Sequence, residues 1–135
     1  MTRLKRRGAA AIEFALVVPV ALVMLYGIAE YSWYMFNFMT VTTAVQEGVR
    51  TGSFVASEDD PAAVATAKVR EQLTLYGLHG DTATVTTAMT TDTYGDVLSV
   101  RVQVPYTALV GLIPVPDTLD QRASAFHEGD IATDN

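Results

Sequence analysis

FALVVPVALVMLYGIA, residues 14–29, is a stretch without a single charged side chain. Extended back to residue 9, it is interrupted by only one charged residue, Glu13. A helix over residues 9–29 would be about 31 Å long, which is enough to cross the hydrocarbon core of a bilayer. Pro19 lies inside the stretch, but membrane helices tolerate proline better than helices in water do. We therefore predict one membrane-spanning helix.

Basic residues precede this stretch. They are Arg3, Lys5, Arg6 and Arg7, four of the nine basic residues in a chain whose net charge is −6. Positive charges beside a membrane helix favour the cytoplasmic side, so residues 1–8 are predicted to be a basic cytoplasmic leader. The rest of the chain, beyond about Tyr31, is then on the far side. Its acidic balance argues against nucleic acid as a partner, because phosphate binding needs clustered Lys and Arg.

The helix is predicted to continue past the membrane. Residues 31–39, YSWYMFNFM, are aromatic and amphipathic, as is typical of the membrane interface. A more polar stretch, residues 40–50, follows. We expect one long helix over residues 9–52, then a small domain over residues 53–128.

The small domain begins with a second helix. Asp60 is a good N-cap and Pro61 a good first helical residue, while Gly77 or Gly80 would end the helix. The apolar side chains expected on roughly one of its faces are Val64, Ala67, Val69, Leu73 and Tyr76.

Three strands are predicted after this helix. The first covers residues 82–90, a turn follows near residues 92–96, and the second covers residues 97–104, where apolar and polar residues alternate. A third is expected over residues 119–128. The fold class is therefore α+β, with one helix packed on a three-stranded antiparallel sheet.

Two further segments complete the domain. Residues 106–116 form an apolar loop between the second and third strands. We expect this loop to pack under the sheet, with a partner-docking surface as the alternative. Residues 129–135 are polar and are expected to be a flexible tail.

Glu13 is the unusual residue of the membrane segment. A carboxylate at the edge of the hydrocarbon is costly unless it has a partner. If the chain were cut between Gly8 and Ala9, the new α-amino group would lie four residues before Glu13, one helical turn away. Glu13 could then pair with its own amino group or with that of a neighbouring subunit.

Two plainer interpretations of the N-terminus stay open. One is a cleaved secretory signal peptide, because residues 27–29, Gly-Ile-Ala, make a passable cleavage site before Glu30. The other is an uncleaved anchor, which would carry a binding or sensory module. The carboxylate of Glu13 counts against both, and the hydrophobic pattern that continues past residue 29 counts against the first.

Residues 7–19, RGAAAIEFALVVP, together with residues 27–31 and 44–50, resemble the TadE family of the tight-adherence (Flp-type) pilus system. The likeness covers roughly residues 7–52, with Gln46 where the family often has Arg. It implies a type IV pilin-like architecture and a role as a minor pilin or pseudopilin in the bacterial inner membrane, with the small domain in the periplasm. It also implies a cut after Gly8 by a prepilin peptidase, which would recognise Glu13 and Phe14. Other pilin-like subunits would be partners through the N-terminal helix.

Catalytic and metal sites are not expected. His79 and His127 are isolated in the sequence and are predicted to lie at ordinary surface or turn positions, and no nucleophile motif is present. There is no Cys. We therefore expect no enzyme activity, no metal and no cofactor. Glu47 and Arg50 lie three residues apart and could pair within the helix or between subunits.

Overall fold

The computed structural model describes residues 2–56, 59–78, 80–111 and 113–128, with the backbone alone for residues 2–7 and 9. The side chains of Arg3, Lys5, Arg6, Arg7 and Ala9, together with His79 and the tail at residues 129–135, lie outside this description. The chain divides into two compact units. One joins Met1–Tyr34 with Ala108–Val115, and the other joins Met35–Thr107 with Pro116–Asn135.

The predicted long helix is confirmed as α1 (Thr2–Ser53), which also includes residues 2–8 of the predicted leader. Pro19 lies inside α1 and does not end it. Among the described residues, α1 is the one helix long and apolar enough to cross a membrane. The apolar side chains of residues 14–29 are mostly exposed in the single chain, as expected for residues that face lipid or other helices.

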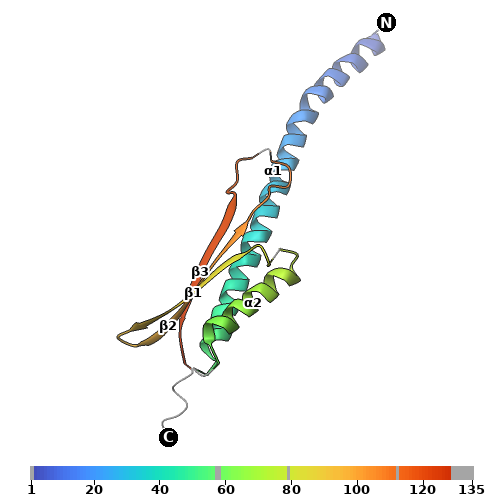
Figure 1. Ribbon diagram of the computed structural model, residues 1–135. Coiled ribbons are helices and arrows are strands. Elements are labelled where there is room, and N and C mark those ends of the chain that lie inside the picture. Colours follow the sequence, from blue (N-terminus) through green and yellow to red (C-terminus); the bar gives the residue numbers. More distant parts are fainter. Residues whose placement is uncertain (1, 57–58, 79, 112, 129–135) are drawn as a thin grey trace. The chain divides into compact units, whose positions relative to one another are not determined.

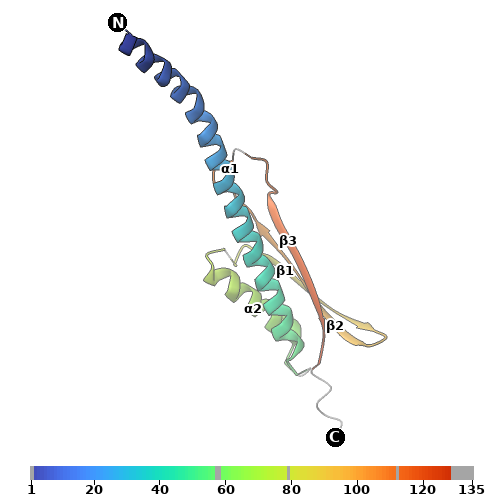
Figure 2. The ribbon, with the colours of Figure 1, turned by 180° about the vertical axis from the view of Figure 1, so that it is seen from behind.

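The second unit contains the predicted sheet. Its strands are β1 (Thr84–Asp92), β2 (Gly95–Pro105) and β3 (Thr118–Phe126), paired antiparallel in the order β1-β2-β3. Figures 1 and 2 show α2 (Pro61–Leu75) and the C-terminal part of α1 beside this sheet. The predicted α+β class is therefore confirmed.

The alternation along β2 sets the core of the second unit. Leu98, Val100, Val102 and Val104 are buried, whereas the residues between them are exposed or half-buried. Successive side chains of a strand point to opposite faces, so the apolar set lines one face of the central strand. The predicted half-buried strand is confirmed.

Helix α2 begins as predicted. Asp60 caps it, since its Oδ1 accepts a hydrogen bond of 3.3 Å from the backbone N–H of Ala63, and Pro61 follows at the first position. Beyond its end, Gly77 adopts a φ of 74°, and the N–H of Leu78 bonds back to the carbonyl of Leu73 at 2.9 Å. This is the left-handed turn that glycine favours after a helix.

The predicted buried face of α2 is partly wrong. The buried residues are Pro61, Ala65, Val69 and Leu73, which follow one another at intervals of four. Ala67 and Tyr76 are exposed and Val64 is half-buried. Small and apolar residues occur on most sides of this helix, so its sequence leaves the register of the buried stripe open. Packing against α1, β1 and β2 decides it.

Glycines in α1 let α2 approach closely. A Cβ atom added at Gly48 would lie 2.4 Å from Cγ2 of Val69, and one added at Gly52 would lie 2.8 Å from the carbonyl oxygen of Pro61. Such separations are too short for real contacts. The backbone of α1 therefore lies so close to α2 at Gly48 and Gly52 that a side chain at either position would collide with α2.

Candidate functional site

The predicted processing segment is part of α1. Gly8, Glu13 and Phe14 are exposed, and a Cβ atom added at Gly8 would meet nothing within 4 Å. The bond between Gly8 and Ala9 lies inside the helix. This segment is therefore an open helix surface that another protein can reach.

A second carboxylate, Glu30, is in a very different environment. Its side chain is buried in the first unit, with 1% of its surface exposed. Its carboxylate oxygens accept three backbone hydrogen bonds, from the N–H groups of Leu109 at 2.8 Å, Val110 at 2.7 Å and Gly111 at 3.1 Å. We call this arrangement the Glu30 clasp. It joins α1 to residues 108–111, which run beside the helix in Figure 1.

The clasp pairs the Glu30 carboxylate with three backbone N–H groups, all of which would be costly to bury without a hydrogen-bond partner. Three successive N–H groups form a concave donor surface, and hydrogen bonds to a carboxylate are roughly twice as strong as those between neutral groups. Gly111 has a φ of 75°, a left-handed conformation that side chains rarely adopt. Glycine at this position therefore helps the backbone to turn its N–H groups toward Glu30.

The clasp corrects the expectation that the apolar loop packs under the sheet. Residues 108–115 belong to the first unit, whereas the sheet belongs to the second. Leu109, Val110 and Ile113 are each more than 40% exposed. The loop is fixed through its backbone, which leaves these apolar side chains outside, and Leu112 is outside the described residues.

Sequence reasoning had noted Glu30 as the residue after a candidate cleavage site and as one of the residues 27–31 that resemble the TadE family, and had given it no partner. The available signal was a carboxylate directly after an apolar stretch, a position where an ionisable side chain needs a partner. Its partners lie 79 to 81 residues further along the chain. Backbone N–H groups carry no sequence signature, so the partners could not be identified from sequence.

The possible pair between Glu47 and Arg50 is loose. Oε2 of Glu47 and Nη1 of Arg50 are 4.0 Å apart, and both side chains are at least 40% exposed. Exposed pairs of this kind contribute about 0–1 kcal/mol. Both groups therefore remain accessible to a neighbouring molecule.

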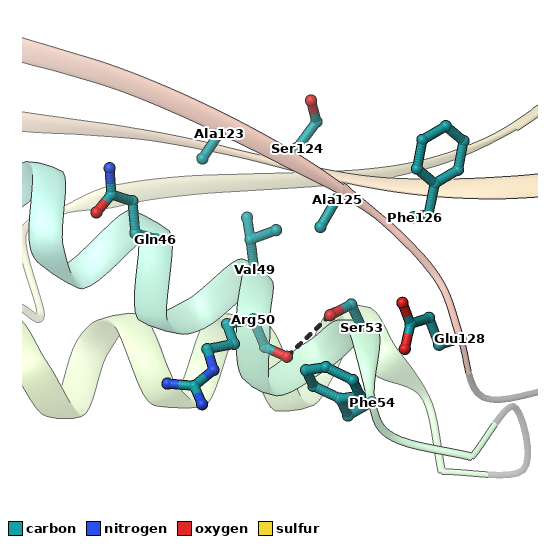
Figure 3. Close-up of a pocket in the computed structure, with 10 residues that line it drawn as sticks. All are labelled: Gln46, Val49, Arg50, Ser53, Phe54, Ala123, Ser124, Ala125, Phe126 and Glu128. Carbon is teal, nitrogen blue, oxygen red and sulfur yellow. Dashed lines mark hydrogen bonds between the residues drawn. The ribbon is translucent and has the colours of Figure 1, made fainter.

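Arg50 also borders a surface groove in the second unit. Figure 3 shows this groove between the last turns of α1 and strand β3, with Val49 and Ala125 facing its interior. Phe54 and Phe126 line it as well, and both are more than half exposed. Its lining contains no paired acid and base or nucleophile arrangement, so the groove has the character of a contact surface.

His127, which was predicted to lie at an ordinary surface or turn position, is buried. His127 is 9% exposed, and its Nε2 lies 2.9 Å from the carbonyl oxygen of Val55. Its backbone N–H donates to the carbonyl of Asp96 at 2.7 Å. His127 thus ties the segment after β3 to the end of α1 and the start of β2. Within the described ranges, no group of three His, Asp or Glu residues could hold a metal ion.

A polar cluster lies across β2 and β3. The Arg101 guanidinium donates to both carboxylate oxygens of Asp120, with its Nε 2.9 Å from Oδ1, and Nε2 of Gln103 donates to Oδ2 at 3.0 Å. The hydrogen bonds from Arg101, followed by the one from Gln103, lower the pKa of Asp120 to about 2. The cluster is exposed and contains no nucleophile or metal set, so we assign it a cross-strand structural role.

Comparison with known proteins agrees with the N-terminal pattern. Residues 8–50 match the TadE-like protein family. The resemblance seen in the sequence is thereby confirmed over this segment, which starts at Gly8 and ends at Arg50. The TadE-like segment includes Glu13, Phe14, Glu30 and Glu47, but it stops before α2 and the sheet. No curated protein and no solved structure matches the chain.

Proposed function

We propose that this protein is a minor pilin or pseudopilin subunit of a tight-adherence pilus system, that it is cut after Gly8 by a prepilin peptidase, and that it acts by assembly. The observation that carries the proposal is the TadE-like match, which begins at Gly8 itself. The protein would either enter the pilus or prime its formation. Nothing in this proposal requires a cofactor.

The proposed topology follows from charge and hydropathy. Basic residues at positions 3–7 would keep the N-terminus in the cytoplasm, and the apolar part of α1 would cross the bacterial inner membrane. The second unit would then lie in the periplasm. The chain has no Cys, so the change of compartment needs no change in its covalent structure.

Assembly would use α1. Its side chains over residues 14–29 are mostly exposed in the single chain, so they are available first to lipid and then to the helices of other subunits. Glu13 is exposed too. After a cut at Gly8, the new α-amino group of Ala9 would lie one helical turn from this carboxylate, or next to the carboxylate of a neighbouring subunit.

The cut itself requires a local change in α1, because proteases bind extended substrate and the bond after Gly8 is helical. Glycine in a helix is less stable than alanine by about 0.5–1 kcal/mol, which makes unwinding easiest at this residue. The absence of a side chain also leaves the backbone open to the peptidase. Both effects favour Gly8 as the residue before the cut.

The alternative function is an uncleaved membrane-anchored binding or sensory module, whose binding surface would be the groove beside β3. Such a protein would retain residues 1–8. A signal peptide cut before Glu30 would divide α1 in its middle and would separate Glu30 from the residues that precede it, which favours the first proposal over secretion.

The N-terminal sequence of the protein recovered from membranes of its host separates these functions. We expect it to begin at Ala9, and we expect Gly8→Leu to block this cut without changing membrane insertion. Ala15→Leu is the matched control, since it adds the same side chain within the apolar part of α1. A start at Met1 would support the anchored module and a start near Glu30 a secreted domain, and either result would contradict the pilin proposal.

A further inference from the structure

The described part of the loop between β2 and β3 presents apolar side chains to the outside. Residues 108–111 and 113–115 carry no charge, and Leu109 is 56% exposed, with Val110 and Ile113 less so. Exposed apolar side chains that lie together mark a surface with a partner. The place at which this loop contacts α1 indicates what the partner is.

The loop is attached at the end of the predicted membrane span. A Cβ atom added at Gly27 would lie 3.4 Å from Cδ1 of Ile113, and Glu30 binds the backbone of residues 109–111. Both positions on α1 are at the C-terminal end of the apolar stretch. Tyr26 and Tyr31, close to the same level, are each about half exposed or more. Tyrosines in this position are typical of the interface between lipid and water.

The Glu30 clasp makes it chemically possible for the loop to lie at the level of the membrane interface. Irregular backbone is excluded from lipid unless its N–H and C=O groups have partners, and a carboxylate near the hydrocarbon needs a partner as well. The carboxylate of Glu30 and three N–H groups of the loop satisfy one another. The arrangement pairs these N–H groups of the loop while its apolar side chains remain exposed.

We infer that residues 108–111 and 113–115 form a second membrane contact, which inserts Leu109, Val110 and Ile113 into the interfacial layer of the bilayer beside α1. The occupant of this surface is lipid, because the surface is continuous with the membrane-spanning stretch and has no charge to recognise a polar protein. The inference rests on α1 crossing the membrane. It is independent of processing and of any role in a pilus.

A cysteine reporter tests the inference, since the chain has no Cys of its own. Full-length Leu109→Cys would be labelled with a polarity-sensitive dye and reconstituted into vesicles of phosphatidylcholine and phosphatidylglycerol, with or without lipids spin-labelled near the headgroup. We expect a blue-shifted emission and strong quenching by the spin label. Leu75→Cys is the matched control, because Leu75 is an exposed leucine on α2, in the other unit, and its label should report water.

A second variant tests the clasp. Glu30→Ala, combined with Leu109→Cys, removes the acceptor of three N–H groups, so the quenching at position 109 should fall toward the Leu75→Cys value. Unchanged quenching in this variant would overturn the role given to Glu30.

Three outcomes would overturn the lipid contact itself. A label at position 109 that reports water in vesicles shows that the loop does not enter the bilayer. A blue shift that appears only in native membranes identifies a protein partner instead. A shift that grows with the ratio of protein to lipid identifies a second copy of the chain.

Discussion

Two sections of α1 contain similar residues in opposite environments. The first section is residues 14–29, in the first unit, and the second is residues 35–53, in the second unit. In the first section, apolar side chains such as Leu16 and Val20 are exposed, Leu16 to 73%. In the second, Val41 and Val45 are at most 1% exposed within their own unit. The first section is apolar on all sides, whereas the second has its buried residues at intervals of three and four. One continuous helix thus has an exposed apolar section, as a lipid-facing helix would have, followed by a section buried in a protein core.

The glycines of α1 show the same contrast. A Cβ atom at Gly27, in the first section, would reach its nearest atom at 3.4 Å, which is close to ordinary contact. At Gly52, in the second section, it would lie 2.8 Å from a backbone oxygen and 2.9 Å from Cβ of Ala65. The first section tolerates a small side chain, while the second is packed to the limit against α2.

The largest expected effect comes from placing charge in the first section. Leu16→Arg combined with Val20→Arg puts two guanidinium groups on one face of the predicted span, at a cost of about 5–7 kcal/mol for insertion. We expect most of the protein to be lost from membranes washed with alkaline carbonate.

The matched control for this variant is Leu75→Arg with Met89→Arg, which charges two exposed apolar positions of the second unit. It should remain in the membrane fraction. If the Leu16 and Val20 variant is also retained, residues 9–29 do not form the span, and the contrast between the two sections fails.

A smaller effect is expected from filling the helix contact of the second section. Gly52→Ala should lower the free energy of unfolding of the second unit by about 1–3 kcal/mol, because overpacking forces α1 and α2 apart. Gly27→Ala, the same change in the first section, should leave it unchanged. Chemical denaturation of the full chain in detergent measures both. Equal stability of the two variants would show that α1 and α2 do not meet closely at Gly52.

Local patterns were sufficient for most of the fold. The apolar stretch predicted the long N-terminal helix, the cap at Asp60 predicted the start of α2, and the alternation from Leu98 to Val104 predicted β2, because each signal lies within a few neighbouring residues. Such signals fix which residues are apolar and with what period. They do not fix what those residues contact.

The errors are accordingly those of contacts between distant segments. The stripe of α2 was assigned correctly at Val69 and Leu73 and wrongly at its other positions, because small residues surround much of that helix. The loop after β2 was expected under the sheet, because its apolar composition fits a core as well as it fits an exposed docking surface. Glu30 holds the loop in the first unit instead, because it accepts hydrogen bonds from backbone N–H groups 79 to 81 residues further along the chain.

The smallest expected effect concerns the solvent-exposed face of the sheet in the second unit. Asp120 has its pKa lowered to about 2 by Arg101 and Gln103, from an ordinary value of 3.8. A carboxylate with a lowered folded pKa stabilises the folded state above its ordinary pKa, and this contribution is lost as the pH falls through the folded value. Asp120→Asn should therefore lower the melting temperature slightly at pH 7, and its difference from the natural chain should shrink between about pH 4 and pH 2.

Thermal unfolding in detergent across that range measures the difference, with Asp81→Asn, at an exposed aspartate of the same unit, as the control. High salt should reduce the effect of Asp120→Asn, because exposed charges are screened. A constant difference at every pH would assign the effect to shape and not to charge. The polar face of the sheet would then depend on packing, as the core of the second unit does.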